Sequence, residues 1–137
     1  MKLIVQIPCY NEERLLAQTV RNIPRTIEGI DEVAILVIDD GSTDRTVEVA
    51  NMSGVDHIVS FNKNKGLASA FIMGLDTSIN LGADIIVNID ADGSISTEKS
   101  VISIWKGNMA DDFRKNFNLG NMVADDCTVE KIHLLPR

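Results

Sequence analysis

Residues 33–42, which read Val-Ala-Ile-Leu-Val-Ile-Asp-Asp-Gly-Ser, decide the fold of this chain. The six apolar residues Val33–Ile38 show no polar alternation, which is typical of a strand buried on both faces of a parallel sheet. The polar turn Asp39–Ser42 follows at once. In α/β proteins ligands bind beyond the carboxyl ends of such strands, so this stretch predicts both the fold class and the place of a site.

Three similar apolar runs, at Leu3–Ile7, His57–Phe61 and Asp84–Ile89, are expected to be strands as well. Segments with helical spacing separate the four runs. The clearest of them has one apolar stripe and a glycine where a helix should end, formed by Leu67, Ala70, Phe71, Gly74 and Leu75, with Gly82 as the stop. This alternation predicts an α/β domain with a Rossmann-like, mostly parallel sheet flanked by helices.

Three further helices complete the expected pattern. The first follows Asn11 and buries Leu15, Leu16, Val20 and Ile23; the second begins at Ser42 or Thr43 and ends near Gly54; the fourth begins near Ser96 or Thr97, with Val101, Ile104 and Trp105 on one side. We assign residues 1–110 to the α/β domain. Residues 111–137 are an atypical tail, and no apolar strand is expected after residue 111.

The acidic composition argues against one class of partner. The 137 residues carry 13 Lys and Arg against 20 Asp and Glu, a net charge of −7, whereas a nucleic-acid binder normally has a basic face. Two cysteines are too few for a disulfide framework and no secretion signal is visible, so we expect a reduced, cytoplasmic protein. Because no apolar run approaches the roughly twenty residues that span a bilayer, any membrane contact is expected to be peripheral, at the cytoplasmic face.

The most informative polar motif is Asp90-Ala91-Asp92, at the end of the last predicted strand. Two carboxylates one residue apart repel each other, and a divalent cation or ribose hydroxyls at the same place would offset that repulsion. Mg²⁺ commonly takes one or two carboxylates and completes its shell with water and phosphate oxygens. The alternative is an ordinary solvated turn, since Asp and Gly favour turns after strands.

Two other clusters follow strands. Asp39 and Asp40 could accept hydrogen bonds from a nucleobase or ribose, and Tyr10 could stack on the base, although packing would also explain an isolated aromatic residue. Lys65 lies in a loop directly before a predicted helix, where a lysine and free N–H groups together make an anion site. A plain surface loop is the alternative. The usual dinucleotide, NTPase and nucleophile-elbow motifs are absent from the sequence.

Taken together, four motifs resemble those of the family-2 glycosyltransferases, in the polyprenyl-phosphate branch that includes dolichol-phosphate mannose synthase. They are Pro8–Glu13, Asp39–Asp44, Asn64–Ala70 and Asn88–Gly93, which occur in the family's order and spacing. The resemblance implies a GT-A fold whose N-terminal half binds a nucleotide sugar. It covers about residues 2–93.

The resemblance also implies roles for individual residues. The nucleotide-sugar pocket would be formed by Pro8, Tyr10, Glu12, Asp39, Asp40, Lys65 and Asp90. Asp92 would coordinate Mg²⁺ or Mn²⁺ on the diphosphate, with Asp90 facing ribose or the metal, and these two form the expected catalytic pair. The reaction would be inverting transfer from a UDP- or GDP-linked sugar to a lipid phosphate or a saccharide.

The sequence departs from the family pattern after Asp92. Ser94 stands where this branch usually has Gln, and only 45 residues follow Asp92, about half or less of what an acceptor half needs. The alternative is therefore a truncated domain that holds nucleotide and metal but transfers nothing. Ile89–Ser94 also resembles the first motif of haloacid-dehalogenase-type phosphatases, but that fold carries this motif on its first strand rather than on its fourth.

Overall fold

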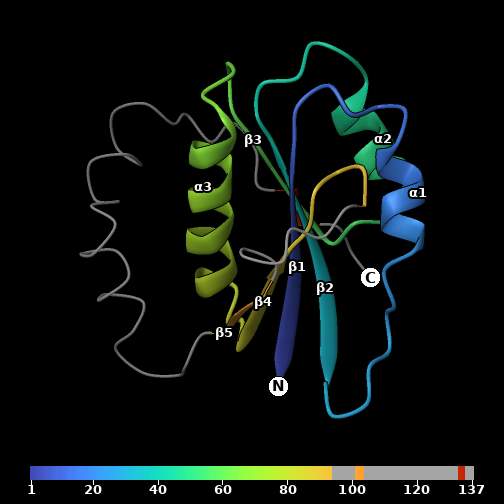
Figure 1. Cartoon of the computed structure of the whole chain (residues 1–137), viewed down its shortest axis with the longest axis vertical. Helices are drawn as coiled ribbons and strands as arrows, with labels where there is room; N and C mark the ends of the chain where they lie inside the picture. Colours follow the sequence, from blue (N-terminus) through green and yellow to red (C-terminus); the bar gives the residue numbers. More distant parts are fainter. Residues whose placement is uncertain (94–100, 104–132, 135–137) are drawn as a thin grey trace.

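The computed structural model describes residues 1–93, 101–103 and 133–134, and these contain one six-stranded sheet in the order β5-β4-β1-β2-β3-β6 (Figure 1). The strands are β1 (Lys2–Cys9), β2 (Glu32–Asp39), β3 (His57–Ser60), β4 (Ile85–Asn88), β5 (Val101–Ser103) and β6 (His133–Leu134). The pairings of β1 with β2 and β4, and of β2 with β3, are parallel. The predicted mostly parallel α/β sheet is therefore confirmed.

Helices cover both faces of the sheet. They are α1 (Leu16–Arg21), α2 (Thr46–Met52) and α3 (Leu67–Asn80). Figure 1 shows α3 on one side of the strands and α1 and α2 on the other. Alternate residues of one strand enter the two cores: Ile35 and Val37 belong to the α1/α2 core, and Leu36 and Ile38 to the α3 core. Burial on both faces explains why β2 is a continuous apolar run.

The predicted fourth helix is wrong where the structure describes it. Val101–Ser103 forms strand β5, which pairs antiparallel with Ile85–Val87 of β4. Val101 and Ile102 are β-branched residues that suit an edge strand, and helical spacing cannot distinguish such a short apolar run from a helix turn. The rest of that segment lies outside the described residues.

The tail also differs from expectation. His133–Leu134 forms the two-residue strand β6, which pairs antiparallel with His57 and Ile58 of β3. A pairing of two residues leaves no pattern in the sequence, because it depends on the exposed backbone of the neighbouring strand rather than on side-chain periodicity. The other tail residues that we assigned lie outside the described part of the chain.

Two helices begin later than predicted. The helix expected from Ser42 or Thr43 begins at Thr46, and its predecessor begins at Leu16, after an exposed Leu15. In the predicted stripe of α3, Leu67 is also exposed, whereas Ala70, Gly74 and Leu75 are buried. The predicted end at Gly82 is confirmed, since α3 ends at Asn80 and Gly82 has a positive φ.

A buried polar side chain joins the centre of the sheet to α3. Gln6 of β1 is fully buried, and its amide nitrogen donates to Asn88 Oδ1 at 3.0 Å and to the Phe71 carbonyl at 3.3 Å. The Ser78 hydroxyl donates to Gln6 Oε1 at 3.4 Å. Gly74 lies against this amide, because a Cβ there would come within 2.8 Å of the Gln6 side chain. The missing side chain at position 74 thus makes room for the polar pair of β1 and β4.

None of the helices in the described part of the chain has the length and apolar character needed to cross a membrane.

We predict that Gly74→Ala destabilises the protein by about 1–3 kcal/mol, because the new methyl group displaces the buried Gln6 amide from its partners. Ordinary helix propensity predicts the opposite sign, a gain of about 1 kcal/mol. Urea unfolding followed by circular dichroism measures the difference. Ala68→Gly, at an exposed position of the same helix, is the control and should cost about 1 kcal/mol. A more stable Gly74→Ala variant would contradict this account of the packing.

Candidate functional site

Four loops meet at the carboxyl edge of the sheet, at the top of the view in Figure 1. They follow β1, β2, β3 and β4, and the residues that the sequence analysis selected lie in these loops or, for Pro8 and Asp39, in the last two residues of a strand. Because these strands are parallel, their ends lie at one edge. Hydrogen bonds between the loops then determine how the edge is shaped.

Asn11 joins the loop after β1 to the loop after β2. It has a φ of +51°, a left-handed conformation that Asn tolerates better than most residues. Its side-chain oxygen accepts the N–H groups of Thr43 at 2.8 Å and Asp44 at 3.3 Å. Its own N–H donates to the Ser42 hydroxyl at 2.9 Å. Ser42 and Thr43 are therefore used between loops instead of capping α2.

Asp44, rather than Ser42 or Thr43, forms side-chain hydrogen bonds at the start of α2. Its carboxylate accepts the N–H of Thr46 at 2.9 Å and also the Thr46 hydroxyl. Slight burial raises the pKa of Asp44, but these hydrogen bonds outweigh it and leave the pKa below its usual value. The N–H of Glu12 donates to the same Thr46 hydroxyl oxygen at 2.9 Å. The first two loops consequently form one connected unit.

Asp40 joins the loop after β2 to the loop before α3. One carboxylate oxygen accepts the N–H of Lys65 at 2.7 Å, and the other accepts the N–H of Gly66 and the Asn64 amide, each at 3.0 Å. Gly41 lets the loops approach, since it has a φ of +69° and a Cβ there would overlap the Lys63–Asn64 backbone. The buried Asp40 carboxylate thus positions the start of α3.

This arrangement changes the interpretation of the predicted anion site. The sequence analysis expected free N–H groups at the start of α3 to form an anion site together with Lys65, but the N–H groups of Lys65 and Gly66 donate to Asp40. The Lys65 ammonium lies 5.8 Å from the centre of the Phe61 ring. Asp39 is also buried, and it accepts the N–H of Ser42 at 3.1 Å.

A cavity of about 180 Å³ opens beside Asp40. Its lining comes from β1, from the end of β2 and from the start of α3, and comprises Pro8, Cys9, Tyr10, Asp40, Asn64, Gly66, Leu67 and Ala70. Three predicted nucleotide-binding residues, Pro8, Tyr10 and Asp40, are thereby brought together. Tyr10 is 46% exposed, so its ring is available at the mouth of the cavity.

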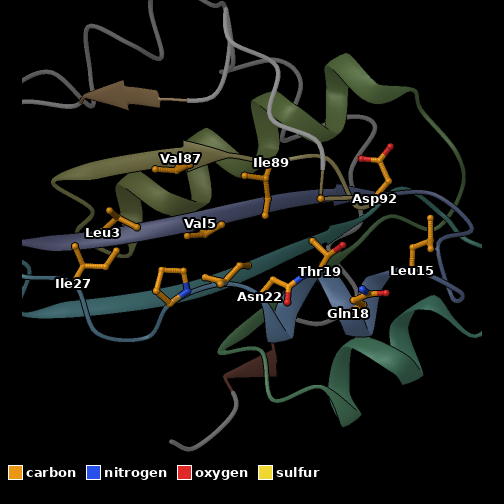
Figure 2. A pocket seen from close by; sticks show the side chains of 13 residues that line it. Leu3, Val5, Leu15, Gln18, Thr19, Asn22, Ile27, Val87, Ile89 and Asp92 are labelled. Carbon is orange, nitrogen blue, oxygen red and sulfur yellow. The ribbon is translucent and has the colours of Figure 1, made fainter.

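Asp92 lies at a different cavity of about 400 Å³, which is mainly apolar and lies between β1, β4 and the α1 side of the sheet. Figure 2 shows Asp92 at one end of this cavity, with Leu3 and Ile27 at the other. The Thr19 hydroxyl of α1 donates to the Ala91 carbonyl at 2.7 Å, which ties the Asp90–Gly93 turn to that helix. Asp92 and Tyr10 therefore share the edge of the sheet but border separate hollows.

Glu12 connects the two parts of the edge electrostatically. Burial raises its pKa, and the negative charges of Asp92, Asp44 and Asp90 raise it further. The Cys9 thiol, below the same loops, has a raised pKa because of burial and the charge of Asp39, and so it is not an activated nucleophile. Across residues 1–93 and the short edge strands, no three His, Cys, Asp or Glu side chains are placed to hold a metal ion by themselves.

We predict that Asp40→Asn loosens the start of α3, because an amide presents two hydrogens where the carboxylate accepted three donors. Amide hydrogen exchange at Lys65 and Gly66 should accelerate about tenfold or more. Asp39→Asn is the control, since Asp39 accepts from Ser42, and it should leave those two amides protected. Equal protection in Asp40→Asn and in the original protein would show that Asp40 does not hold the loop.

We also predict that Asp92→Asn lowers the pKa of Glu12 toward its usual value, since removal of a neighbouring negative charge favours the ionised form. A ¹³C NMR titration of the Glu12 carboxyl group measures the change. Asp31→Asn is the matched control: Asp31 is exposed and pairs with the N-terminal amine at the opposite edge of the sheet. If the pKa of Glu12 does not change in Asp92→Asn, the charge of Asp92 does not act on Glu12.

The comparison with known families is decisive at this point, because residues 4–112 match the family described as glycosyl transferase family 2. The chain belongs to this family. Curated relatives include the polyprenol monophosphomannose synthase of Mycolicibacterium smegmatis, 34% identical over 72% of this chain and 38% of that protein. The undecaprenyl-phosphate mannosyltransferase of Micrococcus luteus is 32% identical over 72% of this chain and 41% of that protein. The chain thus spans about two fifths of the length of these relatives.

Solved structures agree with this assignment. A mannosyltransferase from Pyrobaculum calidifontis in complex with GDP-Man and Mn²⁺ is 26% identical, with a TM-score of 0.54 over 66% of this chain and 27% of that one. The glucosyl-3-phosphoglycerate synthase of Mycobacterium tuberculosis in complex with UDP is 31% identical, with a TM-score of 0.51 over 66% of this chain and 34% of that one. The family resemblance and the GT-A-type fold are confirmed.

Sequence reasoning missed two residues of the site. Leu67 was assigned to the buried stripe of α3 and Asn11 to the start of a helix, and neither was given a role in the site, although both lie within the motifs that carry the family resemblance. Leu67 is the first residue of its helix and directly follows the Gly66 turn. The first position of a helix that follows a strand end indicates a side chain at the edge of the sheet rather than in the core, and this signal could have identified Leu67.

Proposed function

We propose that this chain binds a nucleotide-diphosphate sugar and a divalent cation at the carboxyl edge of its sheet, as the donor-binding part of a glycosyltransferase. The observation that carries the proposal is the meeting of the Tyr10, Asp40 and Asp90–Asp92 loops at one edge in a member of glycosyl transferase family 2. This edge is the ligand-binding position of open α/β sheets.

The width of the edge suits an extended ligand. Neighbouring strands lie about 4.8 Å apart, so the ends of β3 and β4, with β2 and β1 between them, are about 14 Å apart. A nucleoside diphosphate can lie along this row, with its base at the cavity beside Tyr10 and its phosphates toward Asp92. In this orientation Pro8, Tyr10 and Asp39 lie on the nucleoside side, and Lys65 is close to the base.

The cation would be held by Asp92, with Asp90 on the ribose or on the metal. Mg²⁺ and Mn²⁺ accept carboxylate oxygens and share their remaining positions with phosphate, so two carboxylates in one turn fit such an ion when the diphosphate is bound. Burial and, after it, the negative charges of Asp92, Asp44 and Asp90 raise the pKa of Glu12, and a cation bound there would offset those charges. The bound cation would neutralise charge on the departing nucleoside diphosphate.

Names of relatives suggest the acceptor. Two are named for mannose transfer to polyprenol or undecaprenyl phosphate. A phosphate acceptor is already ionised near neutral pH, so inverting attack on the anomeric carbon requires no protein base, whereas a saccharide hydroxyl requires one. We therefore propose a polyprenyl phosphate acceptor, with a saccharide as the alternative. Such an acceptor would bring the protein to the cytoplasmic face of a membrane by peripheral contact.

A second candidate function is binding without transfer. The chain spans about two fifths of its curated relatives, and the site described above is a donor site only. Radiolabelled sugar transfer to a polyprenyl phosphate, measured beside nucleotide affinity, separates the candidates. Turnover supports a transferase, and nucleotide binding without transfer or donor hydrolysis supports a binding domain.

We predict that Asp92→Asn weakens Mn²⁺-dependent binding of UDP or GDP about tenfold or more, because one of the two carboxylates for the cation is lost. Isothermal titration calorimetry with and without Mn²⁺ measures the effect, and the melting temperature should stay unchanged. Asp31→Asn serves as the charge-matched control and should bind normally. Unchanged affinity in Asp92→Asn would remove Asp92 from the site, and no nucleotide binding by the original protein would refute the proposal as a whole.

A further inference from the structure

Leu67 is exposed where an apolar side chain has no packing role. It is the first residue of α3, and 67% of its surface is accessible, although the residues that follow on the same stripe enter the core. Apolar side chains of this size are usually buried in the middle of such a stripe. A single exposed Leu is common on protein surfaces, so the inference depends on what lies beside Leu67.

Leu67 borders the same cavity as a second exposed apolar side chain. Five large apolar side chains are exposed in the described part of the chain, and two of them, Tyr10 and Leu67, border the same cavity. They come from different elements, the end of β1 and the start of α3. Pro8 and Ala70 add apolar surface between them, and Asn64 adds a polar amide.

The position of Leu67 is held by a rigid support. Asp40 accepts the N–H groups of the two residues that precede it, Lys65 and Gly66. The backbone that carries Leu67 is thereby tied to the end of β2, next to the strand that carries Tyr10. Two apolar side chains on supports joined by hydrogen bonds can receive a flat ring without first having to be ordered.

We propose that Leu67 packs on the nucleobase of the donor, opposite Tyr10, and that the two side chains form an apolar clamp. This inference rests on the proposed function and adds a residue to that site. The cavity of about 180 Å³ is smaller than the roughly 300–1,000 Å³ of pockets that enclose a whole ligand, so it suits one ring system. Contact with the faces of a ring contributes affinity for any base, whereas polar edges discriminate between bases.

The experiment compares a ligand that has a base with one that lacks it. Leu67→Ala is titrated with UDP, GDP and inorganic pyrophosphate in the presence of Mn²⁺. Affinity for UDP and GDP should fall about tenfold, because apolar contact with the base is lost, while affinity for pyrophosphate stays within about twofold. Leu67→Met keeps a flexible apolar side chain of similar volume and should retain affinity for both nucleotides within about threefold.

Met52→Ala is the matched control, because Met52 is equally apolar and even more exposed but lies on α2, outside the cavity. It should change none of the three affinities. The clamp is refuted if Leu67→Ala binds nucleotides normally, or if it loses pyrophosphate to the same extent as UDP, since the second result would indicate a general disturbance of the loop. If the original protein binds pyrophosphate but no nucleotide, that result refutes the proposed donor site itself and not only the role of Leu67.

Discussion

The site depends on one buried carboxylate. Asp40 directly follows β2, and its two carboxylate oxygens accept the N–H groups of Lys65 and Gly66 and the amide of Asn64 in the loop before α3. A buried carboxylate without partners would be strongly unfavourable, so this loop is required to remain in place. The start of α3, the wall of the smaller cavity and the exposed Leu67 all follow from that requirement. The acid that the sequence analysis assigned to the base thus also holds the start of α3 in place.

The parallel strands were predictable because they are buried on both faces. Val33–Ile38 and the other three runs contain enough β-branched residues to be recognised as strands from the sequence alone. In the structure two of the four are longer than predicted and two are shorter, in each case by one or two residues at an end. The edge strands β5 and β6 were not predictable, because three and two residues leave no periodic signal and depend on the backbone beside them.

The candidate site was predictable in composition but not in detail. The motifs brought Pro8, Tyr10 and Asp40 to one cavity, as the parallel strands require. They did not indicate that Asn11, Ser42 and Asp44 would bond across loops, because such contacts join residues more than thirty positions apart. Helix-start rules consider only local partners, and for that reason they misplaced the start of α2. The binding roles assigned to all of the site residues stay predictions, namely those of Pro8, Tyr10, Glu12, Asp39, Asp40, Lys65, Asp90 and Asp92.

The hydrogen bond from Thr19 to the Ala91 carbonyl has a consequence for the binding of small molecules. It couples α1 to the turn that carries Asp92, so that a displacement of one moves the other. The apolar cavity of about 400 Å³ lies between that helix and the sheet. A small apolar compound bound in this cavity would displace the turn that carries Asp92. Such a compound need carry neither sugar nor phosphate, and because Asp92 lines this cavity, it would act on the carboxylate that we propose as the cation ligand.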